Sequence, residues 1–200
     1  MKGSLVITAF FAVGVACGLL HIIPDGFING RTSFYVLCAL MFSVGMSIGC
    51  DSATLRSFRQ LNPRLTLLPF VTIAGTLAGA RASSVVLPHR ELSDCLAVGS
   101  GMGYYSLSSI FITEYRGAEL GTVALLANIF RELAALLLAP FLAHRFGKLA
   151  PISVGGATTM DTTLPVITRS VGPEYVVVSV FHGFVTDFSG PFLVTFFCTL

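Results

Sequence analysis

Long runs of apolar residues, separated by short polar or charged stretches, dominate the pattern along this chain of 200 residues. A membrane-spanning helix needs about 20 such residues to cross roughly 30 Å of hydrocarbon. The alternation of apolar and polar positions that a transmembrane β-barrel requires is absent, so the runs predict helices. The expected transmembrane helices cover residues 4–23, 33–50, 65–87, 120–143 and 175–199.

Two further apolar segments, 95–113 and 151–170, are poor candidates for continuous helices. The first carries Gly-Ser-Gly-Met-Gly from Gly99 to Gly103, and each interior glycine costs about 1 kcal/mol relative to alanine. The second carries paired glycines and four threonines between Val154 and Pro165. Non-helical backbone at membrane depth persists only where it is buried in protein or lines a wet cavity. We therefore expect two broken or re-entrant segments.

The composition agrees with this interpretation. Hydrophobic residues make up 54% of the chain and charged residues only 11%, whereas a soluble domain carries about 25% charged residues. The mean hydropathy is +0.84, and the net charge of +2 is too small to indicate a nucleic-acid partner. The five cysteines lack the spacing of a metal site. We expect an all-α integral membrane protein with one membrane domain, 1–200, and without metal or cofactor.

The orientation in the membrane follows from lysine and arginine in the short loops, which favour the cytoplasmic side. The loop between the second and third expected helices carries Arg56, Arg59 and Arg64. If 95–113 enters and leaves by the same side, the basic residues after the fourth helix are cytoplasmic too: His144, Arg145 and Lys148. The N-terminus is then cytoplasmic and the C-terminus external. Two full crossings by the interrupted segments would give the same termini.

A few charged residues lie inside the apolar stretches. A charge at the bilayer centre costs between about 3 and 10 kcal/mol, so it must face protein or water and commonly has a role. Asp161 lies at the centre of 151–170, and the nearest basic residue of that segment, Arg169, is eight positions away beyond a proline. Asp161 is therefore the best candidate to bind a cation directly or to carry a proton.

The last two apolar helices carry further polar residues. Asn128, Arg131 and Glu132 share one helix face, because positions i, i+3 and i+4 are neighbours there. They either contact a substrate or neutralise other charges structurally. Asp187 is either functional or paired with Arg131, and the lone His182 is typical of a satisfied core residue.

Four short motifs follow one another in the second half of the chain. They are Gly-Tyr-Tyr-Ser-Leu-Ser from Gly103, Leu-Ala-Asn from Leu126 with Arg131-Glu132, Gly-Gly-Ala-Thr-Thr-Met-Asp-Thr-Thr-Leu-Pro from Gly155, and Phe-His-Gly-Phe from Phe181. Together they resemble the LysO-type lysine exporter family, over essentially the whole chain and most strongly over 96–184. The resemblance implies an inner-membrane antiporter that exports L-lysine and toxic lysine analogues, coupled to proton influx. It also implies that Asp161 is the family's intramembrane acid.

The chain departs from that family in two respects. Full-length members carry a further N-terminal region with extra helices and a second functional acid, so this chain is similar to the C-terminal part alone. Either a short companion membrane protein would supply the remainder, or the chain would be a reduced version that works as a homo-oligomer. Asp187 also stands where the family is usually aliphatic.

Lysine presents two ammonium groups and one carboxylate, and the candidate residues match these charges. Asp161 can neutralise an ammonium group, while Arg131 or the N-terminus of a broken helix can meet the carboxylate. No Gly-x-x-x-x-Gly-Lys-Ser/Thr motif is present, so an ion gradient must drive uphill flux. The candidate substrate- or proton-binding residues are Asp161, Glu132, Asn128, Arg131, Asp187, Gly101, Gly103, Tyr105, Ser106, Gly155, Gly156, Thr158, Thr162 and His182.

Two other classes of function are compatible with a membrane protein of this kind. An intramembrane hydrolase would use Ser106 or Ser100 as a nucleophile with His182 as its base, although the sequence lacks a Gly-x-Ser-x-Gly elbow. A structural subunit of a membrane complex would need none of these side chains for chemistry, so Asp161→Asn would leave its function intact.

Overall fold

The computed structural model describes residues 61–87 and 90–200, together with isolated positions between 13 and 59. The chain forms two compact units, Met1–Met46 and Ser47–Leu200. The expected helices 4–23 and 33–50 lie largely outside the described residues. The fold of the second unit follows.

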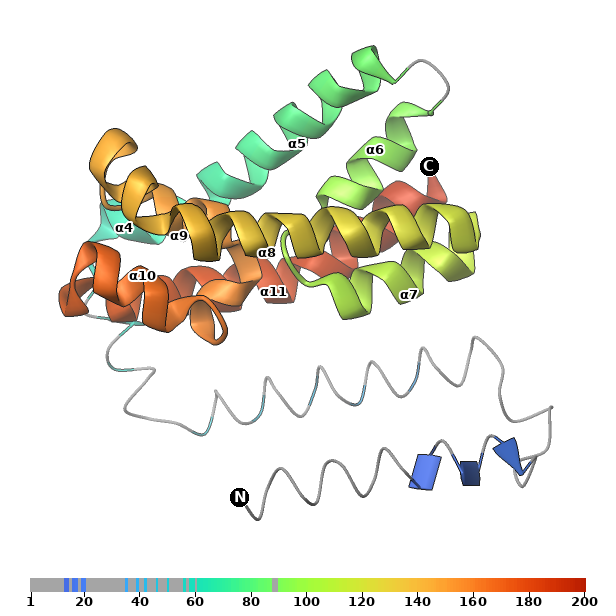
Figure 1. The fold of residues 1–200 in the computed structure, drawn as a ribbon, viewed down its shortest axis with the longest axis horizontal. Helices are drawn as coiled ribbons and strands as arrows, with labels where there is room; N and C mark the ends of the chain where they lie inside the picture. The colour runs from blue at the N-terminus through green and yellow to red at the C-terminus, as the bar shows by residue number, and fades with distance from the viewer. Residues whose placement is uncertain are drawn as a thin grey trace. The chain divides into compact units, whose positions relative to one another are not determined.

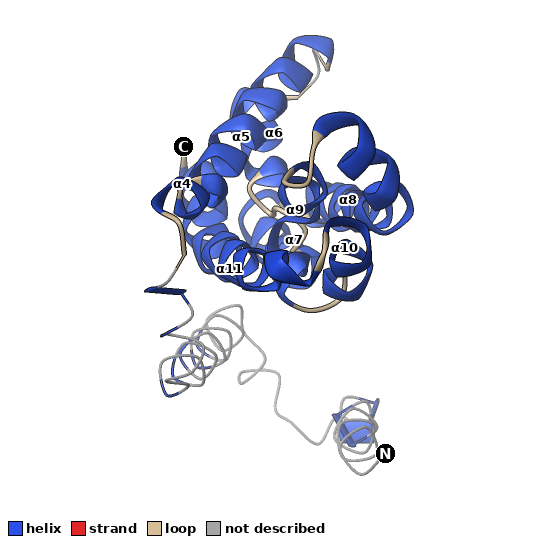
Figure 2. Cartoon of the chain, turned by 90° about the vertical axis from the view of Figure 1, so that its left-hand side faces the viewer, coloured by secondary structure: helices blue, strands red, loops and turns tan. Residues whose placement is uncertain are grey.

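The second unit is built from helices joined by short loops, and Figure 2 shows no strand among its described residues. Its elements are α4 (Pro63–Thr66), α5 (Leu68–Val86), α6 (Leu92–Gly99), α7 (Tyr105–Arg116), α8 (Ala118–Phe146), α9 (Ala150–Gly155), the 3₁₀ turn η1 (Gly156–Met160), α10 (Leu164–Val171), the 3₁₀ turn η2 (Pro173–Tyr175) and α11 (Val176–Thr199). Among the residues that the structure describes, three stretches are long and apolar enough to cross a membrane: Pro63–Val86, Ala118–Phe146 and Pro173–Thr199. The expected fold class, an all-α membrane protein, is confirmed.

The longest helix, α8, has clear signals at both ends. Gly117 precedes it and Gly147 follows it, with φ of +93° and +92°, a backbone region that favours glycine. Glu119 lies in its first turn, and His144 and Arg145 lie in its last turn, as the helix dipole favours. The sequence therefore specifies where α8 starts and stops, and α8 connects the two ends of the unit (Figure 1).

Helices α6 and α7 form a hairpin, called the first hairpin (92–116), whose two outer ends meet. Arg116, at the end of α7, places Nη1 3.5 Å from Glu91 Oε2 and 3.7 Å from Asp94 Oδ1, beside the start of α6. Arg116 Nε also donates to the carbonyl oxygen of Cys198 near the end of α11, at 3.0 Å. The segment expected to be broken therefore reverses direction at its glycines, and both arms reach the same end of the unit.

Helices α9 and α10 form the second hairpin (150–171), whose outer ends lie at the other end of α8. Buried side chains of both arms, Ile152 and Ile167, pack in one cluster with Val178 of α11. Beside this cluster Lys148 Nζ lies 3.2 Å from Glu174 Oε1. In Figure 1 the second hairpin enters the unit from the left and the first hairpin from the right.

Candidate functional site

The tips of the two hairpins meet inside the unit. The backbone N–H of Ala157 donates to the carbonyl oxygen of Met102 at 2.9 Å. Met102 and Gly103 have φ of +46° and +97°, and Gly156 has φ of +62°. A Cβ atom at Gly156 would lie 2.1 Å from the Met102 oxygen. Glycine is therefore required at 156 both by its backbone conformation and by the close approach of the two tips.

Asn128 of α8 holds the tip of the first hairpin. Its Oδ1 accepts a hydrogen bond from the Gly103 N–H at 2.7 Å, and its Nδ2 donates to the Ala124 carbonyl at 2.8 Å. The side chain is buried, and a Cβ at Gly101 would lie 2.5 Å from its Nδ2. Sequence reasoning proposed Asn128 as a substrate ligand, whereas the structure places its amide against the backbone of the tip.

Arg131, one turn further along α8, holds the second hairpin. Its Nε donates to the Val154 carbonyl at 2.9 Å and its Nη2 to the Ser153 carbonyl at 3.1 Å, where α9 ends. Its Nη1 donates to Thr76 Oγ1 of α5 at 3.4 Å. Such bonds satisfy carbonyl groups that the end of a short helix leaves without partners.

Of the two alternatives for Asp187, the ion pair with Arg131 does not form in the described part of the chain. Within 61–87 and 90–200, no carboxylate lies within 4.0 Å of the Arg131 guanidinium. The charge that acts electrostatically on Asp187 is that of Asp161. Glu132 is half-buried and makes no ion pair with the described residues either. The charges of these two helices therefore do not neutralise one another in pairs.

Arg131 lines a cleft of about 380 Å³. Its walls come from α5, α8 and α9, and its lining residues are Val71, Thr72, Gly75, Thr76, Arg131, Ser153 and Val154. A Cβ atom at Gly75 would meet nothing within 4 Å, so this part of α5 faces open space.

Two carboxylates from different segments lie within electrostatic reach of each other. Asp161 follows η1, is exposed, and accepts the Thr162 N–H through Oδ1 at 2.5 Å. Asp187 of α11 is only 5% exposed and makes no hydrogen bond or ion pair in the described part of the chain. Each carboxylate also acts on the hydroxyl of Tyr104. The fold therefore brings together two acids that have no ion-pair partner within 61–87 and 90–200.

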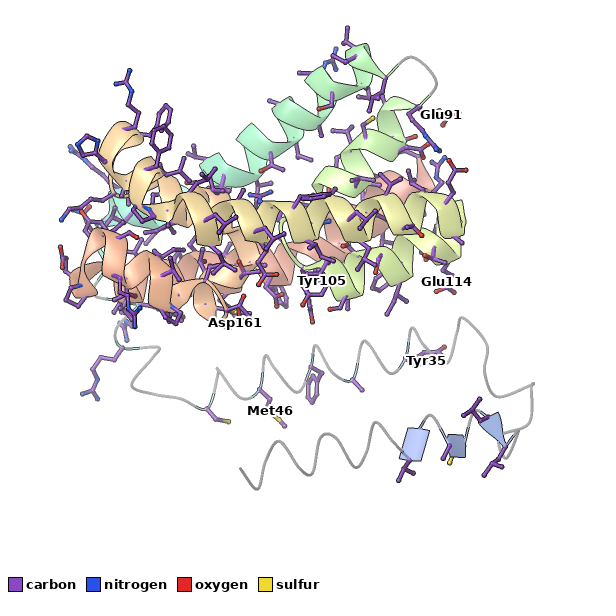
Figure 3. All side chains as sticks on the ribbon, viewed as in Figure 1. Tyr35, Met46, Glu91, Tyr105, Glu114 and Asp161 are labelled. Carbon is purple, nitrogen blue, oxygen red and sulfur yellow. The ribbon has the colours of Figure 1, made fainter. Side chains whose placement is uncertain are left out.

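The remaining residues of the second tip separate into packed and exposed positions. Thr158 is buried: its Oγ1 donates to the Gly155 carbonyl at 2.9 Å and lies 3.2 Å from Thr163 Oγ1. Thr162 is exposed beside Asp161. In Figure 3 Tyr105, at the start of α7, lies on the same edge of the unit as Asp161.

His182 is a buried core residue that connects two elements. Its Nε2 lies 3.0 Å from Thr72 Oγ1 and its Nδ1 3.4 Å from Thr159 Oγ1. Ser100 Oγ donates instead to the Leu96 carbonyl at 2.7 Å, and Ser106 is exposed and makes no hydrogen bond to the imidazole. Neither Ser100 nor Ser106 is therefore activated by His182, as a hydrolase would require.

Sequence reasoning missed the threonines that complete these contacts. Thr72 and Thr76 lie four residues apart on one face of α5, and Thr159 lies in η1. Hydroxyl groups at that spacing in an apolar helix are a usable signal, because such groups commonly hydrogen-bond between helices. No group of three His, Cys, Asp or Glu residues in the described ranges could hold a metal ion.

Long apolar helices and two hairpins that enter between them from opposite ends define an α-helical membrane protein of the transporter class. The family described as "Lysine exporter LysO" matches residues 8–198, and the chain belongs to this family of transporters rather than to an enzyme family. No solved structure matches the chain.

Two curated relatives support the assignment. The chain is 34% identical over 196 residues to "Lysine exporter LysO" of Escherichia coli K12, covering 97% of this chain and 64% of the relative. It is 33% identical over 185 residues to the "Putative lysine exporter" of Haemophilus influenzae, covering 92% of this chain and 93% of the relative. The chain thus spans less than two thirds of the first relative, whereas the second is about as long as the chain itself.

Proposed function

We propose that this protein is a secondary transporter that exports L-lysine and toxic lysine analogues across the inner membrane in exchange for protons. The names of both relatives support lysine as the substrate. The observation that carries the proposal is the pair Asp161 and Asp187, two acids beside the meeting hairpin tips that have no basic partner among the described residues.

The exchange follows from the charges at that pair. Two carboxylates within electrostatic reach repel each other, and either a proton or an ammonium group relieves the repulsion. A carboxylate that holds a proton no longer attracts an ammonium group. Lysine binding and proton binding at Asp161 are therefore alternatives, with Asp187 as the second acid. Glu132 is a further proton site of α8 in this scheme, and Tyr105, Ser106 and Thr162 lie exposed on the approach to Asp161.

The proposed orientation places the Lys148 end of the unit in the cytoplasm. Basic residues gather there, at Arg64, His144, Arg145, Lys148 and Arg169, with Glu174 among them. The opposite end mixes arginines with acids: Arg90, Glu91, Asp94, Glu114, Arg116 and Glu119. An excess of Lys and Arg favours the cytoplasmic side. The two hairpins are then re-entrant, the first from outside and the second from the cytoplasm, and the C-terminus is external.

Five membrane-crossing helices, including 4–23 and 33–50, complete the proposed topology with a cytoplasmic N-terminus. The companion membrane protein or homo-oligomer stays a prediction. Purified chain in liposomes, with and without candidate companions, tests it.

The central experiment measures lysine flux in proteoliposomes under an imposed pH gradient. Asp161→Asn should abolish lysine exchange, because the amide neither attracts ammonium nor titrates, while the amount of protein in the membrane stays at the wild-type level. Glu114→Gln is the matched control: Glu114 is an exposed acid outside the tips (Figure 3), and its neutralisation should leave flux unchanged.

Full lysine flux in Asp161→Asn would contradict the proposal and would favour a structural subunit. Cells that express the same variants should show the same order of resistance to a toxic lysine analogue. Ser106→Ala should retain export, since no reaction at that hydroxyl is proposed.

A further inference from the structure

The Arg131 cleft is chemically unlike the acid pair. A partly buried guanidinium in an apolar bundle lacks a carboxylate partner in the described ranges, and its three hydrogen bonds go to uncharged oxygens. A buried charge without an opposite charge is costly, and it favours an anion within reach. Arginine carries five N–H groups, so donors remain beyond the three that are bonded.

The cleft is also separate from Asp161. Its walls come from α5, α8 and α9, whereas in Figure 3 Asp161 lies at the lower edge of the unit and α5 at the upper edge. Electrostatic interaction joins Asp161 to Asp187 and Tyr104, and Arg131 takes no part in it. One side of the hairpin tips therefore attracts cations, and the other side attracts anions.

We propose that the Arg131 cleft is a subsite for the carboxylate of an α-amino acid, and thus for the head group of the exported substrate. Its volume, about 380 Å³, falls in the range of small-molecule sites, roughly 300–1,000 Å³. Arg131 supplies charge-assisted N–H donors for the carboxylate. The Thr76 hydroxyl and the carbonyl of Ser153 supply acceptors for the α-ammonium group. This inference rests on the proposed function and adds that Arg131 recognises the carboxylate of the substrate.

A carboxylate bound in the cleft would also affect the second hairpin, because Arg131 contacts both. The same guanidinium holds the end of α9, so a carboxylate that binds it competes with the carbonyls of Ser153 and Val154. Occupancy of the cleft therefore acts on the second hairpin, whose tip carries Asp161 five residues beyond Gly156. Substrate recognition and the position of the acid are linked through one side chain.

The test compares lysine with lysinamide, which keeps both ammonium groups but replaces the carboxylate by a neutral amide. Wild-type proteoliposomes should prefer lysine by at least about tenfold in competition, as a charge-assisted hydrogen bond implies. Arg131→Gln should reduce that preference to about one. If Arg131 only positions α9, Arg131→Gln should lose affinity for lysine and lysinamide equally. The preference for lysine would then remain, and this result would overturn the proposal.

A second pair of variants avoids any loss of folding in Arg131→Gln. Gly75 and Gly79 lie one turn apart on α5, and a Cβ at either meets nothing within 4 Å, but only Gly75 lines the cleft. Gly75→Leu should fill the cleft and raise the KM for lysine about tenfold or more, whereas Gly79→Leu should behave as wild type. Equal behaviour of the two variants would overturn the proposal.

The same measurements separate the possible failures. A wild-type protein that exchanges no lysine contradicts the proposed function and the subsite together. Lysine exchange without preference over lysinamide contradicts the subsite alone. A cleft that holds an acidic lipid headgroup instead predicts the same lysine preference in Gly75→Leu as in wild type, with flux that depends on anionic lipid in the vesicles.

Discussion

The contact between the two hairpin tips makes Gly156→Ala the most informative single substitution. The new methyl group would lie 2.1 Å from the Met102 carbonyl oxygen, so that oxygen must retreat by about 1 Å to reach ordinary contact. The hydrogen bond from the Ala157 N–H to the same oxygen, now 2.9 Å, would be lost. Leaving that buried donor unsatisfied costs about 1–3 kcal/mol.

Backbone strain adds to this loss, because Gly156 has φ of +62° and an L-residue there costs about 1–3 kcal/mol. The free energy of unfolding should therefore fall by about 2–6 kcal/mol. Gly147→Ala is the matched control: its φ is +92°, but nothing lies within 4 Å of its Cβ. The free energy of unfolding of Gly147→Ala should therefore fall only by the cost of the backbone strain.

Thermal unfolding of the purified protein in detergent measures the difference, at about 2–4 °C for each kcal/mol in a chain of this size. Lysine flux in proteoliposomes provides the second measurement, and Gly156→Ala should lose it while Gly147→Ala retains it. Equal unfolding temperatures and equal flux in the two variants would show that the tips do not meet as described.

Two further predictions concern topology and the first hairpin. Single cysteines at Arg90 and His144, in a variant depleted of other cysteines, should react with an impermeant reagent from opposite sides of the membrane, because α8 separates the two ends of the unit; labelling from one side would refute the re-entrant first hairpin. Asn128→Ala should lower the free energy of unfolding by about 1–3 kcal/mol, since it leaves the buried Gly103 N–H without an acceptor. Thr122→Ala, on the exposed side of α8, should change stability by less than about 0.5 kcal/mol, and an equal loss in both variants would contradict the role of Asn128.

The fold class was predictable because apolar run length and charge spacing are local properties. A stretch such as Ala118–Phe146 is recognisable from its composition, and its flanking glycines mark its ends. The interruptions were predictable for the same reason. Glycine clusters disfavour continuous helix wherever they occur, and the helices break at Gly99–Gly103 and at Gly155–Gly156.

The partners of the candidate residues were not predictable from one helix at a time. Helical periodicity places Asn128 and Arg131 on one face of α8, but it does not say what lies opposite that face. The structure places backbone groups of two different hairpins there, from residues 25 and 23 positions away. The ion pair of Arg131 with Asp187 had looked reasonable because both charges lie in apolar helices. Packing instead brings Asp187 towards Asp161.

Asn128 and Arg131 lie one turn apart on α8, and together they connect α8 to both hairpins. One turn of α8 contacts both hairpins, which enter the unit from opposite ends. Asn128 accepts from Gly103 of the first hairpin, and Arg131 donates to the carbonyls of Ser153 and Val154 in the second. Because a helix turn is rigid relative to the loops around it, this turn of α8 fixes the positions of both tips. The hydrogen bond from Ala157 to the Met102 carbonyl also holds the tips together. A displacement of either tip must therefore break a bond to α8 or carry α8 with it. That constraint links the two ends of the unit without requiring the acids and the arginine to touch.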